Sequence, residues 1–235
     1  MYPEVRVYAD PFEGLAVQLT ELRGLIKLVP PLIEADRERR WKEISERPSD
    51  GEDGDIIDLY EAEAGPEEGW GHADFGRTIR VAAIVTAWAA FHDYLTHELR
   101  NGFLSADLSA HPQLAQLVED ETRRWDRRFD DIARRYQDFA RIKLSELPSW
   151  PAVLHARELR NALVHNQGQH TRAYLNTKLA YRPTKDDLAG FTPPADASDL
   201  INRELIPLSY ELADSMIVHL RTAATEVRAA LDSAP

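Results

Sequence analysis

Residues 77–103 read RTIRVAAIVTAWAAFHDYLTHELRNGF and contain the longest apolar run of the chain, from Val81 to Phe91. This run is shorter than the roughly 18 residues that cross a membrane, so no membrane partner is expected. Its alanines permit close helix packing, and larger apolar residues recur near helical spacing, at Ile79, Trp88, Phe91, Leu95 and Leu99. The stretch predicts a central helix that is apolar nearly all round in its first half and deeply buried.

The segments on both sides of this helix also have helical apolar periods and predict an all-α fold. Residues 12–47 form one kinked helix or two abutting helices, because Pro30 and Pro31 interrupt the period. Pro112 opens a long amphipathic helix that runs to about Leu147.

Two segments lack a helical pattern. Residues 48–76 are rich in Gly, Pro, Asp and Glu and predict a mobile acidic loop. Residues 168–200 predict an irregular insertion, with room for a small hairpin at residues 173–181. A last helix is expected over residues 199–231, bent near Pro207.

Length and composition narrow the class of protein. The 235 residues can bury a full core, and a single domain over residues 1–235 is expected. The formal net charge of -12 argues against broad, sequence-blind nucleic-acid binding, because counterion release rewards dense basic surfaces. The chain has no cysteine, and its first residues, MYPEVR, lack the regions of a secretory signal. A cytoplasmic location is therefore expected.

The stretch RNALVHN, residues 160–166, carries the most chemical information. It closes a helix predicted from about Ala152 to His165, with Ser149 as the N-cap and Gly168 as the terminator. Arginine offers phosphate a planar fork of donors, and histidine titrates near neutrality. These side chains can cleave a phosphodiester without a metal, so neither a metal nor a cofactor is expected.

Arg160 followed by Asn161, with His165 four residues further on, resembles the motif of the HEPN superfamily. Asn166 and Gly168 complete a His-Asn-x-Gly ending that agrees with this setting. The resemblance implies an antiparallel helical bundle and a homodimer in which the two motifs face each other. It also implies a metal-independent endoribonuclease of the kind found in toxin-antitoxin and phage-defence systems. RNA would be the substrate, and an antitoxin or another regulatory protein would be a further partner.

The expected reaction is a transesterification in which the ribose 2'-hydroxyl attacks the neighbouring phosphorus and leaves a cyclic phosphate. His165 would move the proton, an effect worth about 10²–10⁴-fold. Arg160 would stabilise charge on the phosphoryl oxygens, and Asn161 and Asn166 would support the imidazole or bind the phosphate.

Helix geometry complicates this assignment. At about 100° and 1.5 Å per residue, Arg160 and His165 lie roughly 140° apart around the helix, whereas Asn161 and His165 share a face. A competent site needs the arginine to wrap round the helix, the helix to unwind, or a second subunit to complete the pocket. The HEPN resemblance favours the second subunit.

Three other interpretations remain open. Arg160 can pair with an acidic neighbour, either Glu158 or an acid on another helix, while His165 merely ends its helix. The chain can also be a non-catalytic HEPN-like module that binds RNA, a nucleotide or a protein, or a helical structural protein without an RNA role.

The remaining candidate groups are weaker. His92 and His97 are five residues apart and do not make the i, i+4 pair of a helical metal site, while His155 could line the same cleft as His165. An arginine-rich stretch is expected to pair with acids four residues earlier on a solvated surface, leaving its aromatic residues to the core; its members are Arg123, Arg124, Arg127, Arg128, Arg134, Arg135 and Arg141.

Overall fold

The computed structural model describes residues 10–46, 72–103, 111–113, 116, 117, 120, 129–180 and 205–234. This part of the chain is helical, and it contains no strand beyond one isolated bridge between Gln169 and Leu205. Its elements are α1 (Pro11–Ser45), α3 (His72–Phe103), α6 (Phe129–Ala140), the 3-10 helix η2 (Leu144–Glu146), α7 (Trp150–His165), α8 (Arg172–Ala180) and α9 (Tyr210–Asp232). The expectation of an all-α chain is confirmed for these residues.

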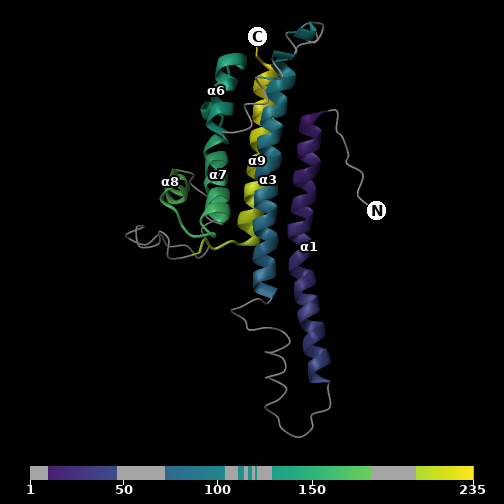
Figure 1. Ribbon diagram of the computed structural model, residues 1–235. Helices are drawn as coiled ribbons and strands as arrows, with labels where there is room; N and C mark the ends of the chain where they lie inside the picture. The colour runs from purple at the N-terminus through teal and green to yellow at the C-terminus, as the bar shows by residue number, and fades with distance from the viewer. Residues whose placement is uncertain are drawn as a thin grey trace.

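The helices pack around α3 and α9, which lie side by side in the middle of the molecule (Figure 1). Helix α1 contacts both of them on one flank, and α7 contacts both on the other. Helix α6 packs against α3 on the same side of the bundle as α7, and α8 packs on α7. The helix that carries the arginine–histidine motif therefore forms one outer wall of the bundle.

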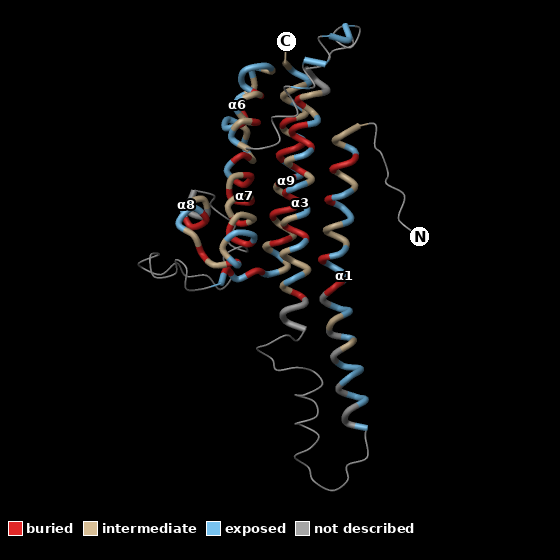
Figure 2. Tube along the Cα trace, viewed as in Figure 1, coloured by how far each residue is buried: buried red, intermediate tan, exposed pale blue. Residues whose placement is uncertain are grey.

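Helix α3 supplies much of the core, as its sequence predicts. Phe91 and Leu95 are fully buried, and Figure 2 shows buried residues recurring along its length. The burial is one-sided, however, because Ala82, Thr86 and Ala89 are exposed. The expectation of a helix buried nearly all round was therefore wrong, because one side of α3 is not covered by the other helices.

Helix α1 is a single element, and its two prolines do not divide it. Leu19, Ile26 and Val29, which precede Pro30 and Pro31, are buried, whereas none of the described α1 side chains after Pro31 is buried. Packing of this face against α3 and α9 anchors the first part of α1, and the helix continues past the prolines with a mostly exposed surface.

Helix α6 ends at Ala140, seven residues before the predicted end. Arg141 has a positive φ of 60°, and the amide of Ile142 donates to the carbonyl of Tyr136 at 3.1 Å, which closes the helix. The fully buried Tyr136 hydroxyl donates to the Leu95 carbonyl at 2.9 Å and fixes this end against α3. Most of the stretch between Pro112 and residue 128 lies outside the described residues.

The two predicted irregular segments are only partly described. Residues 48–71 of the predicted acidic loop lie outside the described residues, and the rest of it is already helical because α3 begins at His72. Helix α8 replaces the predicted hairpin, since Thr171 caps it by accepting from the Tyr174 amide at 3.1 Å.

The last helix begins later than predicted. Ser209 accepts a hydrogen bond from the Leu212 amide at 3.1 Å and caps α9, so the helix starts at Tyr210 without a bend at Pro207. Residues 199–204 lie outside the described residues.

A bidentate ion pair joins α1 to α9, and its loss should cost stability. Arg23 binds Asp214 through Nε at 2.6 Å and Nη2 at 2.9 Å, and the hydrogen bonds from Arg23 hold the pKa of Asp214 below 3.8. We expect Asp214→Asn to lower the free energy of unfolding by about 1 kcal/mol at neutral pH. A carboxylate with a lowered pKa stabilises the fold above its unfolded value and loses that effect in acid.

The check is urea denaturation followed by circular dichroism from neutral pH to below 3.8. The difference between wild type and variant should shrink as the pH falls through the lowered pKa of Asp214. Asp138→Asn is the control, since Asp138 is exposed on α6 and makes no ion pair with the described residues. An equal loss of stability at every pH would contradict the ion-pair explanation.

Candidate functional site

Helix α7 is fixed by its buried face. Val153, Ala156, Leu159 and Ala162 are buried in the core, at successive i, i+3 spacings along one side of the helix. Its charged residues Arg157, Glu158 and Arg160 are only partly buried, and His165 is exposed. These polar residues of α7 therefore lie away from its buried face, and the packing of that face holds the helix in place.

The start of α7 is held by another helix. Ser149 occupies the N-cap position, but its side chain makes no capping hydrogen bond within α7. Its hydroxyl donates to Glu226 Oε1 at 2.8 Å and its amide to Oε2 at 3.0 Å, so a carboxylate of α9 binds at this terminus. The predicted start is confirmed, whereas the predicted capping interaction is wrong.

The end of α7 places His165 at the last helical position. Gln167 and Gly168 both have positive φ angles, and the Gly168 amide donates to the Ala162 carbonyl at 2.9 Å. The Gly168 carbonyl in turn accepts from the Ile206 amide at 2.8 Å. The predicted terminator is confirmed, and it ties the motif to the segment that precedes α9.

The arginine wraps round the helix to reach the histidine. Arg160 Nη1 lies 3.1 Å from His165 Nε2 and 3.2 Å from Asn161 Oδ1. The guanidinium is always protonated and can only donate, so this contact requires an unprotonated Nε2 on a neutral imidazole. The predicted residues Arg160, Asn161 and His165 thus meet within one chain, and the angular separation does not itself demand a second subunit.

Arg160 has no carboxylate partner among the described residues. The nearby Glu158 instead binds Arg157 Nε at 2.8 Å, and Asp130 binds Arg157 Nη1 at 2.8 Å. The Nε of Arg160 is buried without a hydrogen-bond partner. The alternative in which Arg160 pairs with Glu158 is therefore wrong, and the guanidinium retains charge and donors for an anion.

Asn166 is not part of this cluster. Its backbone amide donates to the Ala162 carbonyl at 3.1 Å as the C-cap of α7. Its side chain makes no hydrogen bond with Arg160 or His165 in the structure. Asn166 therefore ends the helix here, and its expected phosphate contact stays a prediction.

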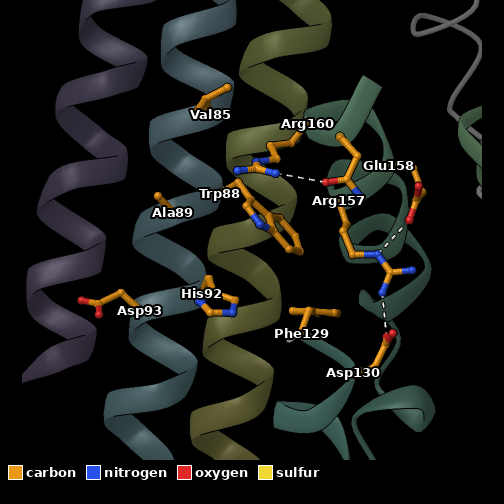
Figure 3. Close-up of a pocket in the computed structure, with 11 residues that line it drawn as sticks. Val85, Trp88, Ala89, His92, Asp93, Phe129, Asp130, Arg157, Glu158 and Arg160 are labelled. Carbon is orange, nitrogen blue, oxygen red and sulfur yellow. Dashed lines mark hydrogen bonds and ion pairs between the residues drawn. The ribbon is translucent and has the colours of Figure 1, made fainter. Parts of the chain in front are cut away.

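A groove of about 900 Å³ runs between α3 and α7 beside Arg160. In the close-up, the Arg160 guanidinium lies at one end, Trp88 lies between it and Phe129, and His92 lies near Phe129 (Figure 3). Its described lining residues are Val85, Trp88, Ala89, His92, Asp93, Phe129, Asp130, Arg157, Glu158, Arg160 and Asn161. The uncovered side of α3 is thus one wall of a groove that contains two of the motif residues.

Sequence reasoning missed this groove because it assigned the aromatic residues to the core. Trp88 and Phe129 do pack together, with ring centroids 5.0 Å apart, and Phe129 stacks on the buried Trp150 at 5.4 Å. The sequence did carry one signal for the groove. Helix α3 has apolar residues, including small ones such as Ala89, on more of its sides than the neighbouring helices of one bundle can cover.

The other predicted groups lie elsewhere. His155 is buried, with Nδ1 3.3 Å from Thr177 Oγ1 and its ring stacked on Tyr174, so it faces α8 and does not line the groove. His170 is also buried and packs near the same tyrosine.

The arginine stretch pairs differently from the expectation. Asp130 binds Arg157 of α7, and Arg134 lies 3.7 Å from Asp131 rather than pairing with Asp130. Residues 121–128, which hold four of the arginines, lie outside the described residues. Within the described part, no group of three or more His, Asp or Glu side chains is arranged to hold a metal.

No family model matches this chain, and no curated protein or solved structure matches it either. None of the described helices combines the length and apolarity that crossing a bilayer requires. The geometry of the site is therefore the basis on which a function is assigned to this chain.

Gly168 is the residue whose substitution should most disturb the end of α7. It has a φ of 78°, and a Cβ there would lie 2.6 Å from Arg77 Nη2. Arg77 also donates to the Ile206 carbonyl at 3.1 Å, so its displacement would loosen the segment that holds the turn. We expect Gly168→Ala to destabilise the protein by roughly 1–3 kcal/mol.

Gly24→Ala is the matched control, because Gly24 lies inside α1 and an added Cβ there meets nothing within 4 Å. This change should stabilise the protein by about 0.5–1 kcal/mol through helix propensity. Thermal and urea denaturation of both variants measure the two effects. Equal changes of the same sign would show that the turn places no special demand on residue 168.

Proposed function

We propose that this chain is a HEPN-like endoribonuclease that cleaves RNA without a metal, by attack of the ribose 2'-hydroxyl. One observation carries the proposal: Arg160 Nη1 lies 3.1 Å from His165 Nε2, and no described carboxylate neutralises that arginine. A proton-transfer group and a phosphate-binding cation thus share one exposed end of a rigidly packed helix.

Substrate binding would free the histidine for catalysis. A phosphate oxygen accepts a charge-assisted hydrogen bond from guanidinium more strongly than a neutral imidazole does. Phosphate would therefore draw Nη1 of Arg160 away from His165, leaving Nε2 as an unoccupied base. Asn161 lies on the same face as His165 and within reach of the guanidinium, so it can keep the arginine oriented during this exchange.

The bond changes balance without a co-reactant. His165 Nε2 takes the proton of the 2'-hydroxyl as its oxygen bonds to phosphorus, and Arg160 stabilises the charge on the non-bridging oxygens. The bond from phosphorus to the 5'-oxygen breaks, and the imidazolium returns the proton to that oxygen. The products are a 2',3'-cyclic phosphate and a free 5'-hydroxyl.

We expect purified protein to cleave RNA in excess chelator and to leave intact a substrate with deoxyribose at the cleaved position. Arg160→Ala and His165→Ala should each lower the cleavage rate by at least about 10²-fold while leaving the melting temperature nearly unchanged. Arg221→Ala is the control, because Arg221 is exposed on α9, outside the groove.

The measurements are gel analysis of end-labelled RNA, mass spectrometry of the new termini, and thermal melts. Full activity in both motif variants would sink the proposal. Tight RNA binding without cleavage would support the alternative, a non-catalytic HEPN-like module that binds RNA.

A homodimer with the two His165 side chains lining one cleft is part of this proposal. Exposed apolar side chains flank the motif: Val164 is 44% exposed beside His165, and Leu205 is 54% exposed opposite Gln169. An isologous interface there would bring both motifs to the two-fold axis. A toxin or defence enzyme of this kind would also need a regulatory partner, and the net charge of -12 suits a basic antitoxin.

A charge at Val164 should break this dimer. We expect Val164→Glu to shift the protein toward monomer in sedimentation velocity and to lower RNA cleavage at the same protein concentration. Leu28→Glu is the control, because Leu28 is 63% exposed on α1, on the opposite flank of the bundle (Figure 1). Dissociation by Leu28→Glu alone would place the interface far from His165 and contradict the shared cleft.

A further inference from the structure

We propose that the groove between α3 and α7 binds one nucleotide of the RNA, with its phosphate on Arg160 and its base against Trp88, and that it prefers bases carrying an exocyclic amino group. The inference rests on the proposed ribonuclease function and assigns the nucleotide next to the cleaved bond. The volume of the groove, about 900 Å³, lies within the range of pockets that enclose small molecules.

The charges along the groove suit a single phosphate. Arg157 is neutralised by Asp130 and Glu158, each at 2.8 Å, whereas Arg160 has no carboxylate partner among the described residues. The exposed Asp93 adds a further negative charge. A run of phosphates would be repelled by these acids, but one phosphate at the Arg160 end would meet the unneutralised guanidinium.

In the middle of the groove, an apolar wall lies next to the Arg160 guanidinium. Trp88 is 7% exposed, so a base would lie against the edge of the indole, between the side chains of Val85 and Ala89. Trp88 is held in place by Phe129 and Phe91, whose ring centroids lie 5.0 and 6.1 Å away. An aromatic edge and apolar side chains beside a phosphate-binding arginine would give a single unstacked base an apolar contact without a stacking face.

The far end of the groove selects for hydrogen-bond donors. Asp130 Oδ1 accepts from Arg157, which leaves Oδ2 as an acceptor near the groove, whereas the Asp93 carboxylate points away from the other lining side chains and lies 3.4 Å from His97 Nε2 (Figure 3). A carboxylate accepts from the amino group of cytosine but repels the carbonyl that uracil has at the same position. Cytosine and uracil nucleotides differ only at this position and at the adjacent N3, which accepts in cytosine and donates in uracil, so their affinities report the hydrogen bonds on this edge of the base.

The first test titrates the full-length protein with 3'-CMP, 3'-UMP and inorganic phosphate by isothermal calorimetry. We expect 3'-CMP to bind about tenfold more tightly than 3'-UMP, as one charge-assisted hydrogen bond allows. Asp130→Asn should abolish this ratio, because an amide can serve either base. Asp131→Asn is the matched control, since Asp131 lies on the same helix and outside the groove.

A second pair of variants tests the location. Ala89→Phe should fill the groove and weaken both nucleotides at least tenfold, whereas Ala82→Phe, on the same helix and outside the groove, should change neither. Equal affinity for inorganic phosphate and both nucleotides, or a cytosine preference that survives Asp130→Asn, would overturn the inference. RNA cleavage without any base preference or effect of Ala89→Phe would overturn it and leave the ribonuclease standing. Nucleotide binding with the expected preference in a protein that cleaves no RNA would keep the groove and overturn the proposed function.

Discussion

The burial of one face of α7 against α3 and α9 is the constraint on which the site depends. Leu159 and Ala162 are fully buried, so the residues between and beside them cannot turn inward without leaving cavities in the core. Arg160 is therefore held at the margin of the core, where its Nε is covered and its terminal nitrogens remain available. Desolvating part of the guanidinium strengthens its attraction for an anion, because fewer waters compete for the charge. A structural packing requirement thus also sets the chemistry of the arginine.

The contact between Arg160 and His165 defines a resting arrangement of the site. A neutral imidazole that accepts from a guanidinium is ready to act as a base, but its lone pair is occupied until an anion takes the arginine. The anion and the histidine compete for the same donors, so the base would be released only where a phosphate is bound. This coupling would keep the exposed His165 from reacting with other ligands until a phosphate binds. It requires that Arg160 has no carboxylate partner, as is the case among the described residues.

The sequence was most informative where local patterns and packing agree. The helical period of α3 and the start and stop signals of α7, at Ser149 and Gly168, predicted real elements, because neighbouring residues in the sequence carry these signals. The prediction failed where distant residues decide. Glu226, which is 77 residues from Ser149, replaces the expected cap, and Asp130 binds Arg157 on another helix instead of a neighbour on its own. The groove could not be found from spacing, because its walls come from helices whose association no local pattern records.

The proposed RNA substrate is compatible with the net charge of -12, because the site offers few phosphate contacts. Affinity for nucleic acid normally comes from many phosphate contacts and is then largely independent of sequence. A site with one unneutralised arginine gains little from that source and repels flanking phosphates through Asp93 and Asp130. Binding then has to come from the base, through the wall at Trp88, and from single strands whose bases can leave the stack. An acidic ribonuclease with such a site would bind nucleic acids in general only weakly. Repulsion between its acidic residues and the phosphates would restrict it to few RNAs.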